Sequence, residues 1–378
     1  MRKLALGCSL LLLTLSFVSA QSGRKTQTAP APTPPVEETP PPPPGFSESR
    51  PDASFHRFAP VSKGVKEKGA EPGSGSQTKN KTDDDNPAPL TIETNLITIP
   101  VSVFDRNGFY IPDLKQENFQ VYEDDLEQEI AYFASSEQPF TVIILLDTSP
   151  STVFRIEEIQ QAAIAFLDQL KAQDQVMVVE FDRNVHVLSK PTSNRKTLAK
   201  AIKKADIGGG TSIYDAVDFA LRKELAHIPG RKAIVLFTDG VDTTSDDASF
   251  SGTLRLVEES QTPIFPIYYN TYQENKDAGV DAAGTSLEEY RIGVRYLLEI
   301  AGLTGGRVYQ SESTAEGLQR AFAGIAEELR HQYNIGYYPK ETGPEGQRRF
   351  LKVRVNRPNL IIRARGSYII GSQMKTEN

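Results

Sequence analysis

Three apolar runs in the middle of the chain constrain its fold more than any other feature. They are Thr141–Leu146 (TVIILL), Lys232–Phe237 (KAIVLF) and Ile264–Tyr269 (IFPIYY). A strand that is apolar at nearly every position is buried on both faces, as strands are in parallel sheets covered by helices. Between these runs, apolar residues recur at helical spacing, for example over Ile156–Leu170. We therefore predict an α/β domain in which helices flank a mainly parallel sheet.

The sequence on either side of this domain has β character instead. Before it, Thr91–Phe104 alternates and is rich in β-branched residues, and two shorter strand candidates follow. After it, the candidates are Tyr333–Tyr338, Phe350–Val355 and Leu360–Ala364. Each set is too small to enclose a core alone. We predict that the two sets pair into one small β-sandwich, into which the α/β domain is inserted.

Residues 1–20 have the pattern of a secretory signal peptide. Arg2 and Lys3 precede an apolar run that ends at the small residues Val18-Ser19-Ala20. The alternatives are a membrane anchor, for which the run is short, and a lipoprotein at Cys8, past which the run continues. We expect cleavage, no transmembrane segment afterwards, and a periplasmic, secreted or cell-surface location. Cys8 is the only cysteine, so the cleaved chain would have no disulfide.

Composition distinguishes the part of the chain that can fold from a long proline-rich segment before it. Of the 25 prolines in the chain, 13 lie between Gln21 and Ala88, and this stretch has too few apolar residues to form a core. We predict that it is a disordered linker. The expected division is signal peptide 1–20, linker 21–88, sandwich 89–138, α/β domain 139–332, sandwich 333–372 and tail 373–378.

Charge and histidine content argue against two classes of function. The chain has 42 Lys and Arg against 49 Asp and Glu, a net charge of −7. An acidic chain without a concentrated basic stripe is a poor ligand for nucleic acid, so we expect no such partner. The four histidines are scattered and show neither metal-ligand nor triad spacing, so hydrolase chemistry at a serine has no support.

Oxygen-bearing residues gather where three segments of the α/β domain leave the sheet. The segments are Asp147-Thr148-Ser149-Pro150-Ser151, Gly208-Gly209-Gly210-Thr211 and Thr238-Asp239-Gly240. In open α/β sheets, ligands bind at this edge. Singly, each segment has an ordinary explanation as a helix cap or a turn. Together they offer two carboxylates and three hydroxyls without His or Cys, a set that favours a hard divalent cation with room for an anionic group.

With these motifs in place, Phe140–Arg330 resembles a von Willebrand factor type A domain, which has a Rossmann-like fold. The flanks, including VSVFDRNGFYIPDL and YNIGYYP, are similar to exported von Willebrand A-related proteins typical of Acidobacteria. The resemblance implies a metal-ion-dependent adhesion site (MIDAS) that holds Mg²⁺, or Ca²⁺ or Mn²⁺, directly or through water. The ligands it implies are Asp147, Ser149, Ser151, Thr211 and Asp239. Asp242 follows the third segment closely, and we expect it beside the ligands or in a solvated acidic loop.

These features predict an exported, non-catalytic adhesion module that binds a carboxylate of a protein partner, or of an acidic polysaccharide, through the metal. One alternative is a structural envelope component whose metal only stabilises the loops. Another is a Mg²⁺-dependent phosphotransfer enzyme with Asp147 as nucleophile, which would need a second carboxylate where Ser149 stands. We also hypothesise that Asn270–Tyr290 is a mobile flap over the site; the alternative is a surface insertion without a role.

Overall fold

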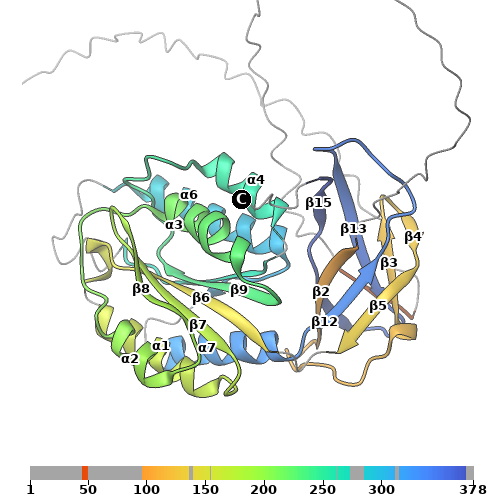
Figure 1. Cartoon of the computed structure of the whole chain (residues 1–378), viewed down its shortest axis with the longest axis horizontal. Helices are drawn as coiled ribbons and strands as arrows, with labels where there is room; N and C mark the ends of the chain where they lie inside the picture. The colour runs from red at the N-terminus through yellow and green to blue at the C-terminus, as the bar shows by residue number, and fades with distance from the viewer. Residues whose placement is uncertain are drawn as a thin grey trace, which may run out of the picture. The chain divides into compact units, whose positions relative to one another are not determined.

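The computed structural model describes residues 45–49, 96–135, 139–153, 155–260, 262–272, 285–310 and 315–371. Two layered regions are present, a helix-flanked sheet and a pair of packed β-sheets (Figure 1). The expected signal peptide, most of the expected linker and residues 273–284 of the hypothesised flap lie outside the described residues. Among the helices that are described, none is long and apolar enough to cross a membrane.

The α/β region contains one six-stranded sheet in the order β11-β10-β9-β6-β7-β8. Its strands are β6 (Phe140–Asp147), β7 (Gln175–Phe181), β8 (Val185–Thr192), β9 (Arg231–Thr238), β10 (Ile264–Tyr268) and β11 (Tyr309–Gln310). All neighbours pair in parallel except β7 and β8, which are antiparallel. The mainly parallel sheet predicted from the apolar runs is therefore confirmed.

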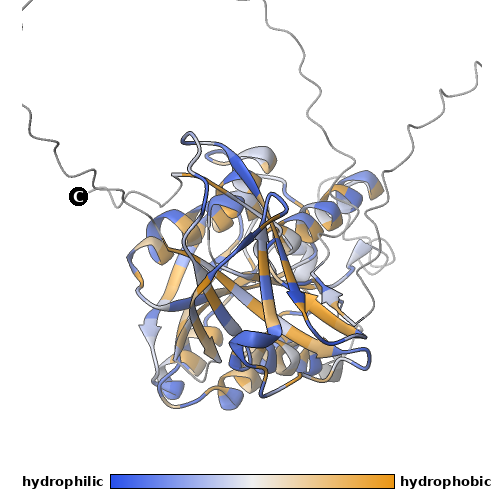
Figure 2. Ribbon diagram, turned by 90° about the vertical axis from the view of Figure 1, so that its right-hand side faces the viewer, coloured by the Kyte–Doolittle hydropathy of each residue, from blue (hydrophilic) through white to orange (hydrophobic). Residues whose placement is uncertain are grey.

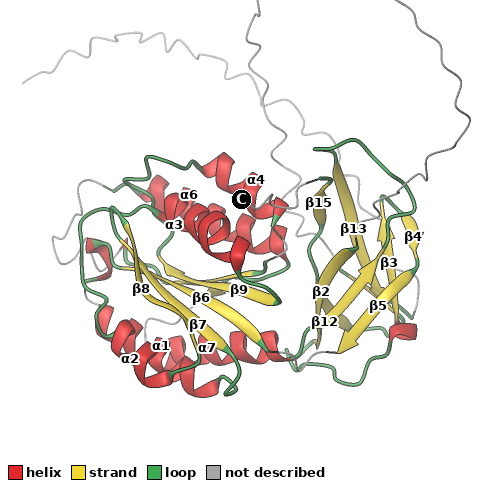
Figure 3. Ribbon diagram, viewed as in Figure 1, coloured by secondary structure: helices red, strands yellow, loops and turns green. Residues whose placement is uncertain are grey.

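Helices cover both faces of this sheet (Figure 3). One face carries α1 (Ile156–Gln169), α2 (Arg195–Ile202) and α7 (Ala315–Arg330), and the other carries α3 (Ile213–Asp218), α4 (Phe250–Glu259) and α6 (Leu287–Thr304). Short turns of other helix types are η3 (Pro150–Thr152), η4 (Phe219–Glu224) and η5 (Leu225–His227). Along β6, Val142 and Ile144 join the core on the first face, whereas Ile143 joins the core on the second. This two-sided burial explains why the run is apolar throughout.

The β region consists of two sheets built from both ends of the chain. One has the order β1-β13-β3-β4 with β15 beside β13, and the other has the order β14-β2-β12-β5. The elements before the α/β region are β1 (Ser47–Glu48), β2 (Ile97–Asp105), η2 (Gln116–Asn118), β3 (Phe119–Glu123), β4 (Leu126–Gln128) and β5 (Ile130–Ser135). Those after it are β12 (Tyr333–Tyr337), β13 (Arg348–Val355), β14 (Leu360–Arg363) and β15 (Ser367–Ile369).

In both sheets, strands from before the α/β region pair with strands from after it, which confirms the predicted pairing across the inserted domain. β12 lies between β2 and β5, and β13 pairs with β3. Apolar residues lie along these strands (Figure 2). They enclose one core that includes Val101, Val121 and Tyr333. The exact limits expected for the sandwich halves and the α/β domain stay predictions.

The short strand β1 differs from the prediction, because its residues belong to the segment expected to be a disordered linker. Ser47 and Glu48 pair antiparallel with β13, and Glu48 forms an ion pair with Arg354. The Ser47 hydroxyl donates to the Arg357 carbonyl at 2.7 Å and accepts from the Leu360 amide at 3.0 Å. The linker prediction is therefore wrong for these residues.

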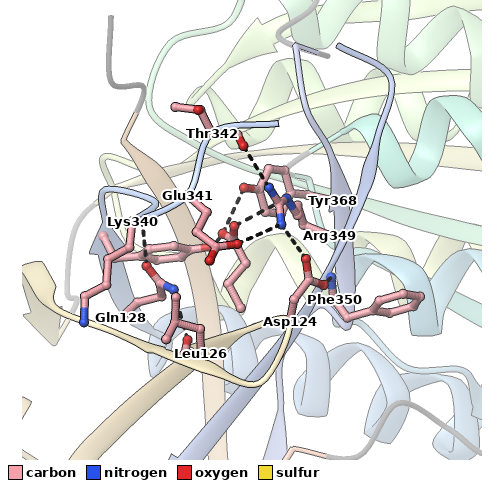
Figure 4. Close-up of polar contacts among 11 residues, drawn as sticks. Asp124, Leu126, Gln128, Lys340, Glu341, Thr342, Arg349, Phe350 and Tyr368 are labelled. Atoms are coloured by element: carbon pink, nitrogen blue, oxygen red, sulfur yellow. Dashed lines mark hydrogen bonds and ion pairs between the residues drawn. The ribbon is translucent and has the colours of Figure 1, made fainter. Parts of the chain in front are cut away.

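A buried polar cluster joins the sandwich strands around Arg349 (Figure 4). Glu123 is 3% exposed and accepts hydrogen bonds from the hydroxyls of Tyr337 at 2.5 Å and Tyr368 at 2.9 Å. Arg349 lies 3.7 Å from Glu123 and donates to Asp124 at 2.7 Å. The acidic residues come from the end of β3, whereas their partners come from β12, β13 and β15. The cluster thus ties the first half of the sandwich to the second.

Candidate metal site

The two carboxylates predicted to bind metal lie at the ends of neighbouring parallel strands. Asp147 ends β6, and Asp239 follows directly after β9. These two strands pair in parallel, with Leu146 opposite Phe237. Both side chains are completely buried, at 0% exposure. The parallel register therefore places the two acidic groups at the same edge of the sheet, as the sequence analysis expects.

Asp147 accepts hydrogen bonds from one amide and from two hydroxyls, those of Ser149 and Thr238. Its Oδ1 accepts a hydrogen bond from the Ser149 amide at 3.0 Å, and its Oδ2 accepts one from the Thr238 hydroxyl at 2.6 Å. The Ser149 hydroxyl lies 3.0 Å from the Ser151 hydroxyl. The turn after β6 therefore directs the serine hydroxyls of the first motif to the same place as the carboxylate.

Asp239 has a corresponding set of donors. Its Oδ1 accepts from the Val241 amide at 3.1 Å, and its Oδ2 accepts from the Thr271 hydroxyl at 2.7 Å. The Ser151 side chain also forms a hydrogen bond with Asp239. Contacts of the first motif thus reach both carboxylates, and four of the five predicted ligand residues lie together.

Thr211, the fifth predicted ligand residue, is anchored to the loops on both sides of it. The Gly208 amide donates to the Thr148 carbonyl at 2.9 Å, which ties the Thr211 loop to the turn after β6. The Thr211 amide donates to the Thr243 hydroxyl at 2.9 Å, and its carbonyl accepts from the Thr243 amide at 2.8 Å. Thr211 is therefore fixed between the segments that carry Asp147 and Asp239.

Burial and mutual repulsion make the two carboxylates resist ionisation together. Burial raises the pKa of Asp147 to about 7, and the negative charge of Asp239 adds to the rise. Burial likewise raises the pKa of Asp239 above its usual range. The described side chains that donate to the pair are hydroxyls, which carry no positive charge. A bound divalent cation would supply that charge, so the donor set fits the metal implied by the resemblance.

The site depends on hydroxyls as much as on carboxylates. Within the described part of the chain, no group of three or more His, Cys, Asp or Glu residues is placed to hold a metal ion. Two carboxylates with serine and threonine hydroxyls form a smaller and harder set, which suits a cation that prefers oxygen.

Asp242 braces the loop that follows Asp239. Its Oδ2 accepts from the Ser245 hydroxyl at 2.5 Å and from the Tyr214 amide at 3.3 Å. The second contact connects this loop to α3, which begins two residues after Thr211. Asp242 therefore acts on the loops around the site, and its expected position beside the ligands stays a prediction.

Two threonines near the carboxylates were missed by the sequence analysis as functional residues. Thr238 belongs to a motif that was recognised, but only its neighbour Asp239 was predicted to act. Thr271 stands just beyond β10, where no motif marks it. Both are buried, at 0% and 1% exposure, and each donates to one carboxylate.

Known proteins resemble this region in sequence. Residues 142–241 match the family model of the von Willebrand factor type A domain. A UPF0353 protein of Nocardia farcinica is 25% identical over 218 residues, which cover 52% of this chain and 65% of that protein. An uncharacterized protein of Synechocystis is 26% identical over 113 residues, which cover 29% of this chain and 27% of that protein. The chain therefore spans less than two thirds of the length of these relatives.

Solved structures also resemble it. An aerotolerance-related membrane protein of Bacteroides fragilis is 18% identical, with 50% of this chain and 98% of that chain covered and a TM-score of 0.39. The von Willebrand domain of the type V pili tip protein Mfa5 of Porphyromonas gingivalis is 22% identical, with 29% and 40% covered and a TM-score of 0.27. Mussel byssus proximal thread matrix protein 1, with a zinc-occupied MIDAS motif, is 16% identical, with 55% and 49% covered and a TM-score of 0.41.

The match to the family model covers the sheet from β6 to β9 and the strand-end segments that carry Asp147, Thr211 and Asp239. The sheet order and the helices on both faces agree with the fold expected from the resemblance. Residues 142–241 of this chain therefore belong to a von Willebrand factor type A domain.

Proposed function

We propose that this chain is an exported, non-catalytic binding module that recognises an acidic group of a protein partner through a divalent cation, Mg²⁺ in the first place. The cation would be held by Asp147, Ser149, Ser151, Thr211 and Asp239. When bound, it supplies the positive charge that attracts a carboxylate of the partner.

The observation that carries this proposal is the pair of fully buried carboxylates at one sheet edge. Burying one carboxylate without a countercharge is costly, and two of them add their mutual repulsion. The raised pKa of Asp147 expresses that cost. A divalent cation offsets both effects, whereas a purely structural role would be served as well by apolar residues of similar size.

The chain's own residues have separate tasks in this proposal. Asp147 and Asp239 provide the negative charge, and the hydroxyls of Ser149 and Ser151 provide neutral oxygens between them. The two carboxylates balance the charge of a divalent cation, and with three hydroxyls they would supply five oxygens, so one position of an octahedral shell would stay open for an anionic group from outside. A phosphotransfer reaction lacks this support, because Ser149 stands where a second acidic group would be needed.

The proposed export rests on the signal-like residues 1–20, and binding rather than catalysis rests on the absence of an acid–base pair in the recognised motifs. A carboxylate is the partner chemistry that a hard cation with an open position prefers, because such a cation binds oxygen ligands. A protein with an exposed Asp or Glu is therefore the proposed ligand.

Calorimetric titration of the chelator-treated full chain with MgCl₂ tests the site. We expect one Mg²⁺ per chain for the wild type and no measurable binding for Asp147→Asn, which keeps the shape but removes a charge. Asp174→Asn is the matched control, because Asp174 is also buried (3% exposed) but accepts from the Phe140 amide at the opposite end of β6. Equal Mg²⁺ binding by wild type and Asp147→Asn contradicts the assignment.

Partner recognition is tested separately from metal binding. We expect Mg²⁺ to be required for capture of proteins from an envelope extract by the immobilised wild type, and capture to be lost with Asp147→Asn but kept with Asp174→Asn. Mg²⁺ binding that raises the melting temperature without enabling any capture would instead favour a structural envelope component with a stabilising metal.

A further inference from the structure

We infer that Thr271 positions Asp239 for the cation, and that Tyr290 holds the Thr271 hydroxyl in its donating direction. The inference rests on the proposed metal site and adds two residues outside the ligand set. Thr271 lies just after β10, and Tyr290 lies in the first turns of α6.

The geometry forms a continuous chain of hydroxyls that ends on a carboxylate. The Thr271 hydroxyl donates to Asp239 Oδ2 at 2.7 Å and lies 3.1 Å from the Tyr290 hydroxyl. Thr271 is 1% exposed and Tyr290 is 6% exposed. Both hydrogen bonds are therefore shielded from water. Hydrogen bonds are stronger in such a buried environment than in water.

Counting hydrogens fixes the direction of the chain. A threonine hydroxyl has a single hydrogen, and that of Thr271 is given to Asp239. The Tyr290 phenol must then be the donor to Thr271. The Tyr290 ring packs against Tyr272 edge to face, with centroids 5.3 Å apart, so the phenol is itself held in place. The result is a donor chain from Tyr290 through Thr271 to Asp239.

This chain matters for metal binding because it fixes one oxygen of Asp239 before the cation arrives. Thr238 does the same for Asp147 from the other strand end. Groups that orient metal ligands in this way typically change metal affinity by about 10–100-fold when removed. A carboxylate without its orienting donor must be ordered at the moment of binding, and the affinity falls by the cost of that ordering.

Helix α6 also contributes to a matched control pair, whose threonine lies on α4. The Tyr296 hydroxyl of α6 donates to the Thr253 hydroxyl of α4 at 3.1 Å, and Thr253 donates to the Ser249 carbonyl at 3.0 Å. Thr253 and Tyr296 are both 0% exposed. This threonine–tyrosine pair ends on a backbone carbonyl instead of a site carboxylate, so its loss should affect stability alone.

The experiment compares Thr271→Val, which has nearly the same shape but lacks the hydroxyl, with Thr271→Ser, Tyr290→Phe and Thr253→Val in the full chain. Calorimetry gives the Mg²⁺ dissociation constant, and thermal unfolding with and without MgCl₂ gives the metal-dependent rise in melting temperature. We expect Thr271→Val to bind Mg²⁺ about 10-fold or more weakly. Thr271→Ser should bind Mg²⁺ nearly as tightly as the wild type, and Tyr290→Phe should bind it more weakly than the wild type but more tightly than Thr271→Val.

A merely structural role gives a different result. Thr253→Val should lower the melting temperature equally with and without Mg²⁺ and leave the dissociation constant unchanged. The same behaviour in Thr271→Val overturns the inference, and if that variant does not fold, an unchanged Mg²⁺ affinity in Tyr290→Phe overturns it. Failure of the wild type itself to bind Mg²⁺ refutes the proposed metal site, an outcome that the variants cannot mimic.

Discussion

Two of the places where the molecule buries acidic groups treat those groups in opposite ways. In the sandwich, Glu123 lies within 3.7 Å of Arg349, and two tyrosine hydroxyls donate to it. At the edge of the α/β sheet, Asp147 is instead buried beside a second carboxylate, and its donors are an amide and two hydroxyls. The first cluster carries its own positive charge, whereas the second is suited to receive one from solution.

The pKa directions of the two clusters express this contrast. Burial and the charge of Asp239 raise the pKa of Asp147 to about 7. Burial also acts to raise the pKa of Asp124 beside Glu123, but the Phe350 amide and Arg349 outweigh it and hold that pKa below its usual range. Burial alone therefore does not distinguish a structural acidic cluster from a binding site; the sign of the surrounding charge does.

Removing the positive charge of Arg349 from the sandwich cluster should have the largest effect on stability. Arg349→Met leaves the buried Glu123 without its positive partner, and breaking such a pair costs about 3–5 kcal/mol. Urea unfolding of the full chain measures it. The control is Lys352→Met on the same strand, whose partner Asp125 is 86% exposed, so the expected loss is below about 1 kcal/mol. Equal losses in the two variants would remove the distinction.

Neutralising Asp147 in the proposed metal site should instead raise the stability of the metal-free protein. The folded-state pKa of Asp147, about 7, lies above its ordinary 3.8, so at about pH 8 the folded protein carries a charge it disfavours. Asp147→Asn should then raise the metal-free unfolding free energy by up to about 4 kcal/mol. Saturating Mg²⁺ should reverse the order, because only the wild type gains binding energy. Thermal unfolding with chelator and with MgCl₂ checks both; a metal-free variant less stable than wild type contradicts the prediction.

Acid should weaken the sandwich cluster slightly. Because the folded pKa of Asp124 is lowered from 3.8, its contribution is present above about pH 4 and is lost as the pH falls through the folded value. The Asp124 side chain is 33% exposed, so we expect less than about 1 kcal/mol. The stability difference between wild type and Asp124→Asn, measured by urea unfolding from about pH 6 to about pH 2, should shrink with acid. A constant difference would show that the ion pair contributes nothing.

Much of the α/β region could be predicted because its signals are local and strong. The strands β6, β9 and β10 match the three apolar runs of the sequence within one residue at each end. Apolar spacing alone predicts that α6 starts at Val294, whereas the helix begins at Leu287, directly after Ser286, which forms a capping box with Glu289. Here the periodic pattern was weak and the cap was the better signal.

Other features lack a local signal. The two residues of β1 lie among prolines and glycines, and their pairing depends on β13, about 300 residues later. Thr271 has an ordinary strand-end sequence, and its role depends on meeting Asp239 across the sheet edge. The meeting of Asp147 and Asp239 could be predicted, since parallel strands bring their carboxyl ends to one edge whatever the intervening loops do.

The pairing of the first strands with the last also sets an order in time. A chain grows from its amino end at roughly 5–20 residues per second. Between the end of β5 at Ser135 and the start of β12 at Tyr333 lie 332 − 135 = 197 residues, which take about 10–40 s to synthesise. The α/β domain can form within that interval, while β2 and β5 still lack β12 and β3 still lacks β13. The strands that are made first are therefore completed last, and the cell must keep half a sandwich from aggregating until the carboxyl end arrives.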